Sequence, residues 1–269
     1  MGKNTDLKHV SDDALKEIVM IKNRIEQLSV KEKSQTDFIE YVKHVWDGFI
    51  EGEHHQLFAE KLERVAQGKC KRLIVNMPPR HTKSEFASVF FPSWMMGLNP
   101  DMKIMQTTHT AELSARFGRK VRNLMDTDEY KQIFDKVSLS ADSKSAGRWE
   151  TNKGGEYFAA GVGGAITGRG ADLLIIDDPH SEQDALSPNA LESAYEWYTS
   201  GPRQRLQPGG IIVIVMTRWS TLDLTEKLIK RMSEEHADQW EILELPAVMD
   251  DNTPLWPGYW KIEELESVK

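Results

Sequence analysis

The stretch RLIVNMPPRHTKSEF, residues 72–86, decides the fold of this chain. Its first part is short and largely apolar, as in a buried strand, and the residues from Lys83 onward have the spacing of an amphipathic helix. A strand, a loop and a helix in this order form the context of a phosphate-binding loop, whose pattern is G-x-x-x-x-G-K-[ST]. Lys83 and Ser84 fill the last two places of that pattern, whereas Met77 and Thr82 stand in its two glycine places.

Short apolar runs and helical stretches alternate along the rest of the chain. The expected strands are 72–77, 103–109, 156–162, 172–177, 210–216 and 240–246, and the expected helices between them are 84–96, 110–126, 187–200 and 221–236. Runs that are apolar at every position occur where both faces of a sheet are covered. The alternation predicts an α/β fold with a mainly parallel central sheet flanked by helices.

The two ends of the chain have a different character. The spacing predicts a helix over 11–29 with Ser11 as its N-cap, a short charged connector at 31–37, and two helices at 37–50 and 55–67. After Pro246 the chain becomes irregular and finishes in a short acidic helix. Ser187-Pro188 and Ser220-x-x-Asp223 are expected to start the helices that follow them.

Composition limits the class of protein. The 269 residues suit one large α/β domain or two small ones, and 39% of them are hydrophobic, as in ordinary globular proteins. The single cysteine, Cys70, excludes a disulfide framework, and the longest apolar run, 211–216, is too short to span a membrane. We therefore expect an intracellular protein with no membrane partner. The net charge of −8 means that any contact with a polyanion comes from a local patch or a partner subunit.

The loop itself offers the means to bind a nucleotide. Arg80, His81, Thr82, Lys83 and Ser84 present five consecutive backbone N–H groups at the start of a helix, where the helix dipole also favours an anion. Lys83 would reach the β- and γ-phosphates of ATP, Ser84 would ligate Mg²⁺, and Arg80 would neutralise charge on the γ-phosphate. The alternative is a surface turn with Lys83 on a solvated helix face.

A second element, DLLIIDDPHSE at 172–182, has the form of a Walker B strand. Asp177 would hold Mg²⁺, and Asp178 would orient or deprotonate the attacking water. Glutamate is more usual at the second place, and Glu182 is a possible substitute for it. Pro179 ends the strand abruptly and leaves both carboxylates at the carboxyl edge of the sheet, where open α/β folds bind ligands. An acidic turn at a strand end is the alternative interpretation.

Three further residues are candidates for the same site. Thr217 ends the buried run 211–216 and would sense the γ-phosphate, unless it only caps the strand. Arg169 lies in the glycine-rich segment before the Walker B strand, where an arginine is more often structural than catalytic. Gln56 opens a helix upstream of the loop and would read the edge of adenine.

Together these residues resemble the N-terminal ATPase domain of the terminase large subunits of tailed bacteriophages, the motors that package DNA. The resemblance covers residue 37 to the end. It depends on HHQLFAEKL, MPPRHTKSE, the TTH strand end, GVGGAITGRGADLLIIDDP, IVMTRW and LPA…PLWPGYW. It implies a P-loop NTPase fold of the additional-strand, catalytic-glutamate type, with Lys83 and Ser84 as Walker A residues and Asp177 and Asp178 as the Walker B pair.

The resemblance also implies partners and a domain plan. The partners are double-stranded DNA, the portal protein, the small terminase subunit and further copies in a ring on the portal, while the isolated domain is expected to be monomeric. Arg169, or else Arg203 or Arg205, would act in a neighbouring subunit. Residues 1–36 would be a helical extension, 37–250 the ATPase domain, and 251–269 the start of a linker toward a nuclease domain. We expect no DNA cleavage by these residues, and action at the procapsid in the host cytoplasm.

Three other interpretations stay open. A helicase-like translocase would share the loop, the acidic pair and the threonine, but it needs a second motor lobe. A scaffold domain whose loop lacks glycine and no longer holds nucleotide is the second, and a small-molecule kinase is a distant third.

Overall fold

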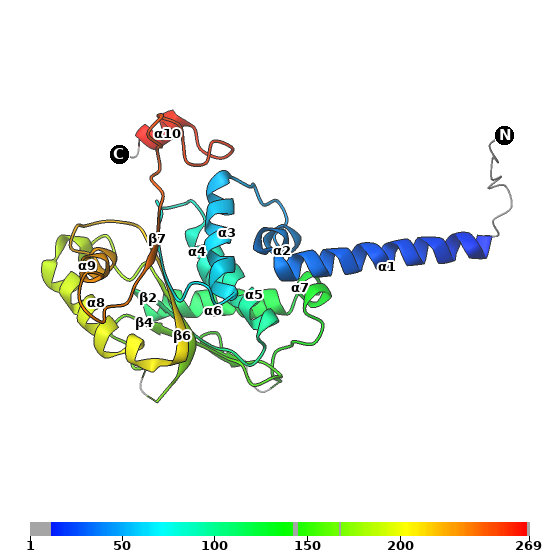
Figure 1. Ribbon diagram of the computed structural model, residues 1–269, viewed down its shortest axis with the longest axis horizontal. Helices are drawn as coiled ribbons and strands as arrows, with labels where there is room; N and C mark the ends of the chain where they lie inside the picture. Colours follow the sequence, from blue (N-terminus) through cyan, green and yellow to red (C-terminus); the bar gives the residue numbers. More distant parts are fainter. Residues whose placement is uncertain (1–11, 142–144, 167, 268–269) are drawn as a thin grey trace.

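A computed structural model describes residues 12–141, 145–166 and 168–267, with the side chains of residues 12–14 left out. The described part is an α/β fold built on one seven-stranded sheet in the order β3-β4-β2-β5-β6-β1-β7 (Figure 1). Every neighbouring pair is parallel except β3 and β4. The strands are β1 (Arg72–Asn76), β2 (Lys103–Thr108), β3 (Arg148–Glu150), β4 (Glu156–Gly161), β5 (Ala171–Asp177), β6 (Leu206–Met216) and β7 (Glu241–Glu244). The predicted fold class, a mainly parallel sheet flanked by helices, is confirmed at this level.

Both faces of the sheet are covered, which explains the continuously apolar strands. Alternate residues of one strand point to opposite faces. Leu73 and Val75 of β1 therefore join one core, packed against the helices that precede and follow β1, whereas Ile74 joins a second core with Tyr198 and Leu224. Each strand side chain in these cores is almost completely buried.

Helices flank the sheet and connect its strands. The α-helices are α1 (Asp12–Thr36), α2 (Phe38–Val45), α3 (Glu53–Ala66), α4 (Lys83–Glu85), α5 (Phe91–Leu98), α6 (Ala111–Met125), α7 (Asp128–Ile133), α8 (Pro188–Ser200), α9 (Leu224–Arg231) and α10 (Ile262–Glu266). Ser187 caps α8 as predicted, because its side chain accepts from the Ala190 N–H. α9 starts later than predicted, and Asp223 caps it, not Ser220.

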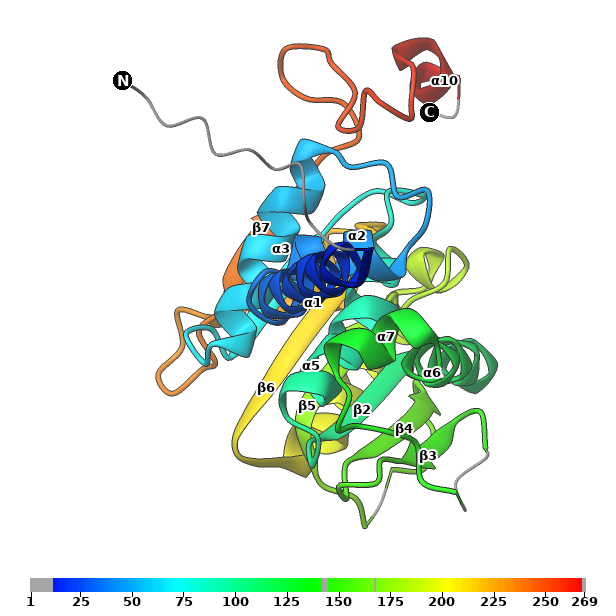
Figure 2. The same cartoon turned by 90° about the vertical axis from the view of Figure 1, so that its right-hand side faces the viewer.

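The predicted connector at 31–37 is wrong, because α1 continues unbroken to Thr36. Its last turns are held from outside the helix: the Trp94 indole N–H donates to the Ser34 carbonyl at 2.8 Å, and the Gln35 side chain donates to the Ile133 carbonyl at 2.8 Å. The charged residues Lys31, Glu32 and Lys33, which suggested a loop, come directly before these anchored positions. The predicted cap, Ser11, lies outside the described residues. Beyond its base, α1 projects from the rest of the molecule (Figures 1 and 2).

Several elements were not predicted, among them α7, the edge strand β3 and a π-helix. The edge strand β3 has three residues, too few to show a period, and pairs with β4 through the buried Trp149, which stacks on Tyr157 at 4.9 Å between ring centroids. The helix after the phosphate-loop candidate changes to a π-helix at Phe86–Phe90 before α5. Pro92 follows immediately and has no N–H to donate, so the regular ladder cannot continue through this turn. In the part of the chain that the structure describes, no helix combines the length and the apolar character needed to cross a membrane.

Candidate functional site

The candidate site lies at the carboxyl edge of the sheet, where three parallel strands end side by side. β1 leads into the loop 77–82 and α4, β5 ends at Asp177, and β6 ends just before Thr217. β6 pairs with β1 on one side and with β5 on the other. The fold therefore brings together two segments that lie far apart in the sequence, the lysine loop and the paired aspartates.

Lys83 and Asp178 meet directly. The Lys83 ammonium lies 2.8 Å from Asp178 Oδ2, and the side chain of Lys83 is nearly buried. The backbone N–H of Thr217 donates to Asp178 Oδ1 at 2.8 Å. Asp178 has a positive φ of 42° and is held by its own N–H, which donates to the Val215 carbonyl at 2.9 Å. One carboxylate thus joins the loop to the ends of β5 and β6.

Asp177 is completely enclosed and holds two hydroxyls. Ser84 Oγ donates to its Oδ1 at 3.0 Å, and Ser88 Oγ donates to its Oδ2 at 2.7 Å. Burial and, to a smaller extent, the nearby Asp178 raise the pKa of Asp177 to about 7, although Lys83 and the two serines oppose that rise. In this environment, a cation that approaches Asp177 would stabilise the ionised form of its carboxyl group.

Two residues behind Asp177 were missed by sequence reasoning. Ser88 lies one helical turn after Ser84, and Gln106 in β2 donates from its side-chain nitrogen to Ser88 Oγ at 3.0 Å. Both are completely buried. The available signals were the four-residue spacing of the serines and a polar residue inside an otherwise apolar strand.

The loop adopts a conformation that usually requires glycine. Thr82 has a φ of 65° and Arg80 a φ of 59°, both in the left-handed region. Thr82 is held there by two bonds of its hydroxyl: it donates to the His81 carbonyl at 2.6 Å and contacts His55 Nε2 at 2.7 Å. His55 Nδ1 accepts the Gly52 N–H at 2.9 Å, so its Nε2 carries the proton and donates to Thr82.

His55 is suited to this role because it stays neutral. Burial, together with the smaller effects of the neighbouring His54 and His81, lowers the pKa of His55 to about 3. Sequence reasoning had only discounted these histidines as a zinc site. No local signal in the sequence links a histidine in α3 to a threonine in the loop.

The loop amides face no competing protein acceptor. Within the described part of the chain, the backbone N–H groups of residues 80–84 donate to no other protein group. Arg80 is exposed beside them, and His81 is buried with its Nδ1 2.8 Å from the Pro79 carbonyl. Unpaired N–H groups at the head of a helix are the donors that bind anions elsewhere.

Gln56 lines a hollow at the start of α3. The hollow has a volume of about 1030 Å³ and is lined by the start of α3 and by the segment 249–258, including Leu57 and Trp256. Gln56 is exposed, and its side-chain amide donates to Glu51. Apolar and polar walls occur together in this hollow, as in many small-molecule sites.

The three arginines that are candidates for action in a neighbouring subunit lie away from Lys83 and the two aspartates. Arg169 precedes β5, at the opposite end of that strand from Asp177, and its guanidinium stacks over the Phe158 ring at 4.2 Å. Arg203 and Arg205 precede β6, and Arg203 pairs with Asp238 at 2.8 Å.

Glu182 lines a separate hollow of about 390 Å³ that also borders Asp178, together with His109 and His180. Glu182 is one of several polar groups in this hollow, whereas the carboxylate that pairs with Lys83 is that of Asp178.

The residues present fit a magnesium–polyphosphate group. A serine hydroxyl and a buried carboxylate supply the oxygen ligands that Mg²⁺ prefers, and a lysine and a row of amides lie beside them for the phosphates. Known proteins add nothing to this geometry: no protein-family model matches the chain, and a search of curated proteins finds no match.

Proposed function

We propose that this chain is a Mg²⁺-dependent ATPase of the P-loop class, of the type with an additional strand between its two nucleotide-binding strands. The observation that carries the proposal is the convergence of Lys83, Ser84, Asp177 and Asp178 at one edge of the sheet. The position of β6 between β1 and β5 supports the additional-strand type. A surface turn with a solvated Lys83 would leave that lysine exposed, whereas it is nearly buried.

Each residue of the site has a separate role in this proposal. The free amides of 80–84 and Lys83 would bind the phosphates, and Ser84 and Asp177 would hold Mg²⁺. The metal, when bound, neutralises charge on the phosphates. Lys83 must leave Asp178 to reach a phosphate, and that exchange frees the Asp178 carboxylate to orient the attacking water. The Thr217 N–H keeps the same carboxylate in place, so the end of β6 follows any change at Asp178.

We further propose, on the terminase resemblance, that hydrolysis drives translocation of double-stranded DNA into procapsids. The portal protein, the small terminase subunit and neighbouring copies in a ring would be the partners, and Arg169 is the first candidate for an arginine that acts in a neighbouring site. Its position away from Lys83 is compatible with that role, and it is partly exposed. A helicase-like translocase would use the same chemistry at residues 80–84.

Two observations favour the scaffold alternative. Thr82 occupies the left-handed position with a side chain, and Lys83 is already neutralised by Asp178. A scaffold would keep this closed arrangement and bind no nucleotide.

Isothermal titration calorimetry with ATP and Mg²⁺ distinguishes the ATPase from the scaffold. We expect saturable binding that Lys83→Ala weakens at least about tenfold, since a lysine–phosphate contact is a charge-assisted hydrogen bond. Asp178→Asn should retain binding and lose turnover, because the amide keeps the shape but cannot take a proton. Lys230→Ala, a change of an exposed lysine in α9, is the matched control. No heat from the wild-type chain would reject the ATPase and favour the scaffold.

A further inference from the structure

The hollow of about 390 Å³ beside Asp178 lies at the edge of the sheet where β2, β5 and β6 end. His109 comes just after β2, and its N–H donates to the Asp178 carbonyl at 3.2 Å. His180 follows β5 and Trp219 follows β6, and both residues line the hollow. The ends of three strands therefore enclose a space that borders the carboxylate to which we assign the attacking water.

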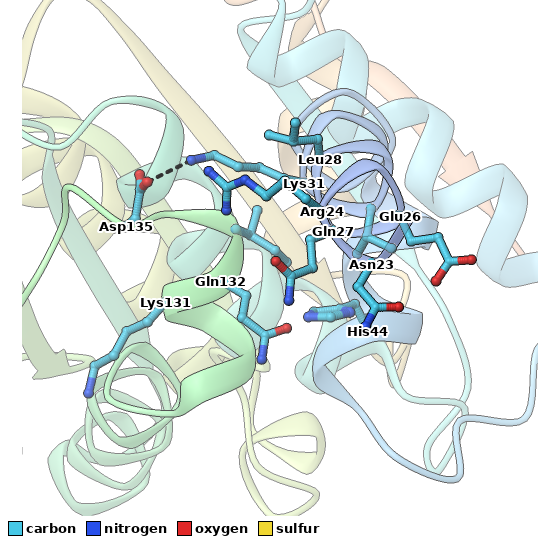
Figure 3. A pocket seen from close by; sticks show the side chains of 12 residues that line it. Asn23, Arg24, Glu26, Gln27, Leu28, Lys31, His44, Lys131, Gln132 and Asp135 are labelled. Carbon is cyan, nitrogen blue, oxygen red and sulfur yellow. Dashed lines mark ion pairs between the residues drawn. The ribbon is translucent and has the colours of Figure 1, made fainter. Parts of the chain in front are cut away.

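This hollow differs from the one between α1 and α7 in what its hydrogen-bond donors already hold. The hollow between α1 and α7 has a volume of about 550 Å³, and Figure 3 shows the ion pair of Lys31 and Asp135 beside it, at 2.9 Å. Lys131, on the same hollow, pairs with Asp126 at 2.7 Å. Both ammonium groups are thus satisfied within the protein. The hollow beside Asp178, in contrast, has a buried donor that no group in the described part of the chain accepts.

That donor is the Nδ1–H of His180. His180 Nε2 accepts the Leu224 N–H at 3.1 Å, in the first turn of α9, so the proton of the neutral ring lies on Nδ1. His180 is 3% exposed, and burial lowers its pKa, although three nearby aspartates, Asp178 among them, oppose that change. Nδ1 of His180 contacts no group within the described residues and, unlike Nδ1 of His109, is not enclosed by protein. Since His180 lines the hollow, its Nδ1–H opens into that space.

The carboxylate of Asp178 can accept a further hydrogen bond on the same side. Its two oxygens accept one bond each, from Lys83 and from the Thr217 N–H, whereas an ionised carboxylate accepts about four. The Asp178 side chain is 27% exposed, and it lines the hollow. A molecule that donates to Asp178 and accepts from His180 satisfies both groups. Water does so, whereas an anion would be repelled by the carboxylate.

We propose that His180 orients the water that attacks ATP, an inference that rests on the proposed ATPase activity. The water lies in the hollow, donates one hydrogen to Asp178 and accepts the Nδ1–H of His180 with one lone pair. Its other lone pair forms the new bond to the γ-phosphorus, while the bond from that phosphorus to the bridging oxygen breaks and ADP leaves with the electron pair. The proton passes to Asp178, and the second product is inorganic phosphate. A water held by two groups at strand ends has few unproductive orientations.

Two substitutions separate the two nitrogens of His180. A glutamine amide reaches about as far as Nε2 of histidine, and an asparagine amide reaches about as far as Nδ1. His180→Gln therefore keeps an acceptor for the Leu224 N–H and loses the donor to the hollow. His180→Asn keeps that donor and loses the acceptor at the start of α9. A role in hydrolysis and a role in holding α9 thus predict opposite results for the two variants.

Single-turnover hydrolysis of ATP with Mg²⁺, with the protein in excess over ATP, tests the assignment. We expect His180→Gln to bind ATP as tightly as the wild type in calorimetry and to hydrolyse it about ten- to a hundredfold more slowly, because the water is misplaced. His180→Asn should hydrolyse ATP within about threefold of the wild-type rate, and its urea midpoint should be lower because the Leu224 N–H loses its acceptor. The matched control is His236→Gln, at a histidine whose side chain is 90% exposed, and it should equal the wild type in affinity, rate and midpoint.

An unchanged rate in His180→Gln would overturn the role of His180 and leave the proposed ATPase in place. An equal loss of rate in both variants would also overturn it, because His180 would then act by holding α9. If circular dichroism shows that His180→Asn does not fold, His180→Gln decides: a slow rate at unchanged ATP affinity supports the inference, and a parallel loss of both refutes it. No hydrolysis by the wild type would reject the ATPase itself and this inference with it.

Discussion

Thr82 allows the strain in the loop to be measured. Its φ of 65° costs a residue with a side chain about 1–2 kcal/mol relative to glycine. Glycine pays about 0.5–1 kcal/mol more than alanine in backbone entropy on folding. Thr82→Ala and Thr82→Gly lose the same hydroxyl bonds to His55 and His81, so these losses cancel between the two variants. We therefore expect the glycine variant to be more stable than the alanine variant by about 0.5–1 kcal/mol.

Urea unfolding followed by circular dichroism measures this difference as a shift in midpoint at a constant slope. The control is the same pair of substitutions at Glu60, an exposed position inside α3, where alanine should be the more stable by about 0.8–1 kcal/mol. The sign of the alanine–glycine difference thus reverses between the two sites. If Thr82→Ala is as stable as Thr82→Gly, the loop is not strained in solution, and the reasoning about its missing glycine fails. Thr82→Ser should remain close to wild type because it keeps the hydroxyl.

Two predictions concern Asp177. The pKa of Asp177 is raised in the folded state, so between pH 4 and 7 the native protein keeps a proton that the unfolded chain has released. The stability of the wild type relative to Asp177→Asn should therefore fall as the pH rises through this window. A difference in urea midpoint that stays constant with pH would contradict this. Ser88→Ala removes a hydrogen bond to Asp177 and should cost about 1–2 kcal/mol of stability and weaken Mg²⁺-dependent ATP binding. The control is Ser93→Ala, at another buried serine that bonds Tyr41, which should cost a similar stability and leave ATP binding unchanged. Equal ATP binding by both variants would remove Ser88 from the site.

The sequence was sufficient for the fold class because buried parallel strands have an unmistakable composition. GIIVIVM is apolar on both faces, and β6 proves to lie in the middle of the sheet with a core on each side. The order of the strands could not be derived from the same pattern, since all the central strands are alike in composition. The connector at 31–37 was mispredicted because charge suggested a loop, whereas its helix is stabilised by contacts with residues far along the chain.

The candidate site was predictable where it depends on strand ends and not where it depends on tertiary contacts. Lys83, Asp177 and Thr217 each follow an apolar run, so their convergence at one edge follows from parallel strands alone. Gln106 and His55 act through partners in other elements, and nothing near them in the sequence identifies those partners.

The bond from His55 to Thr82 gives the glycine-free loop a second consequence. His55 and Gln56 are neighbours at the start of α3, so the residue that fixes the loop is covalently adjacent to the one that borders the hollow at 249–258. A side chain at the left-handed position is strained, but it provides a hydroxyl that glycine cannot, and this hydroxyl ties the loop to α3. The strain of about 1–2 kcal/mol is comparable with the stabilisation that the two hydrogen bonds of Thr82 contribute. Thr82 therefore exchanges the freedom of a glycine loop for a rigid connection between the loop and α3.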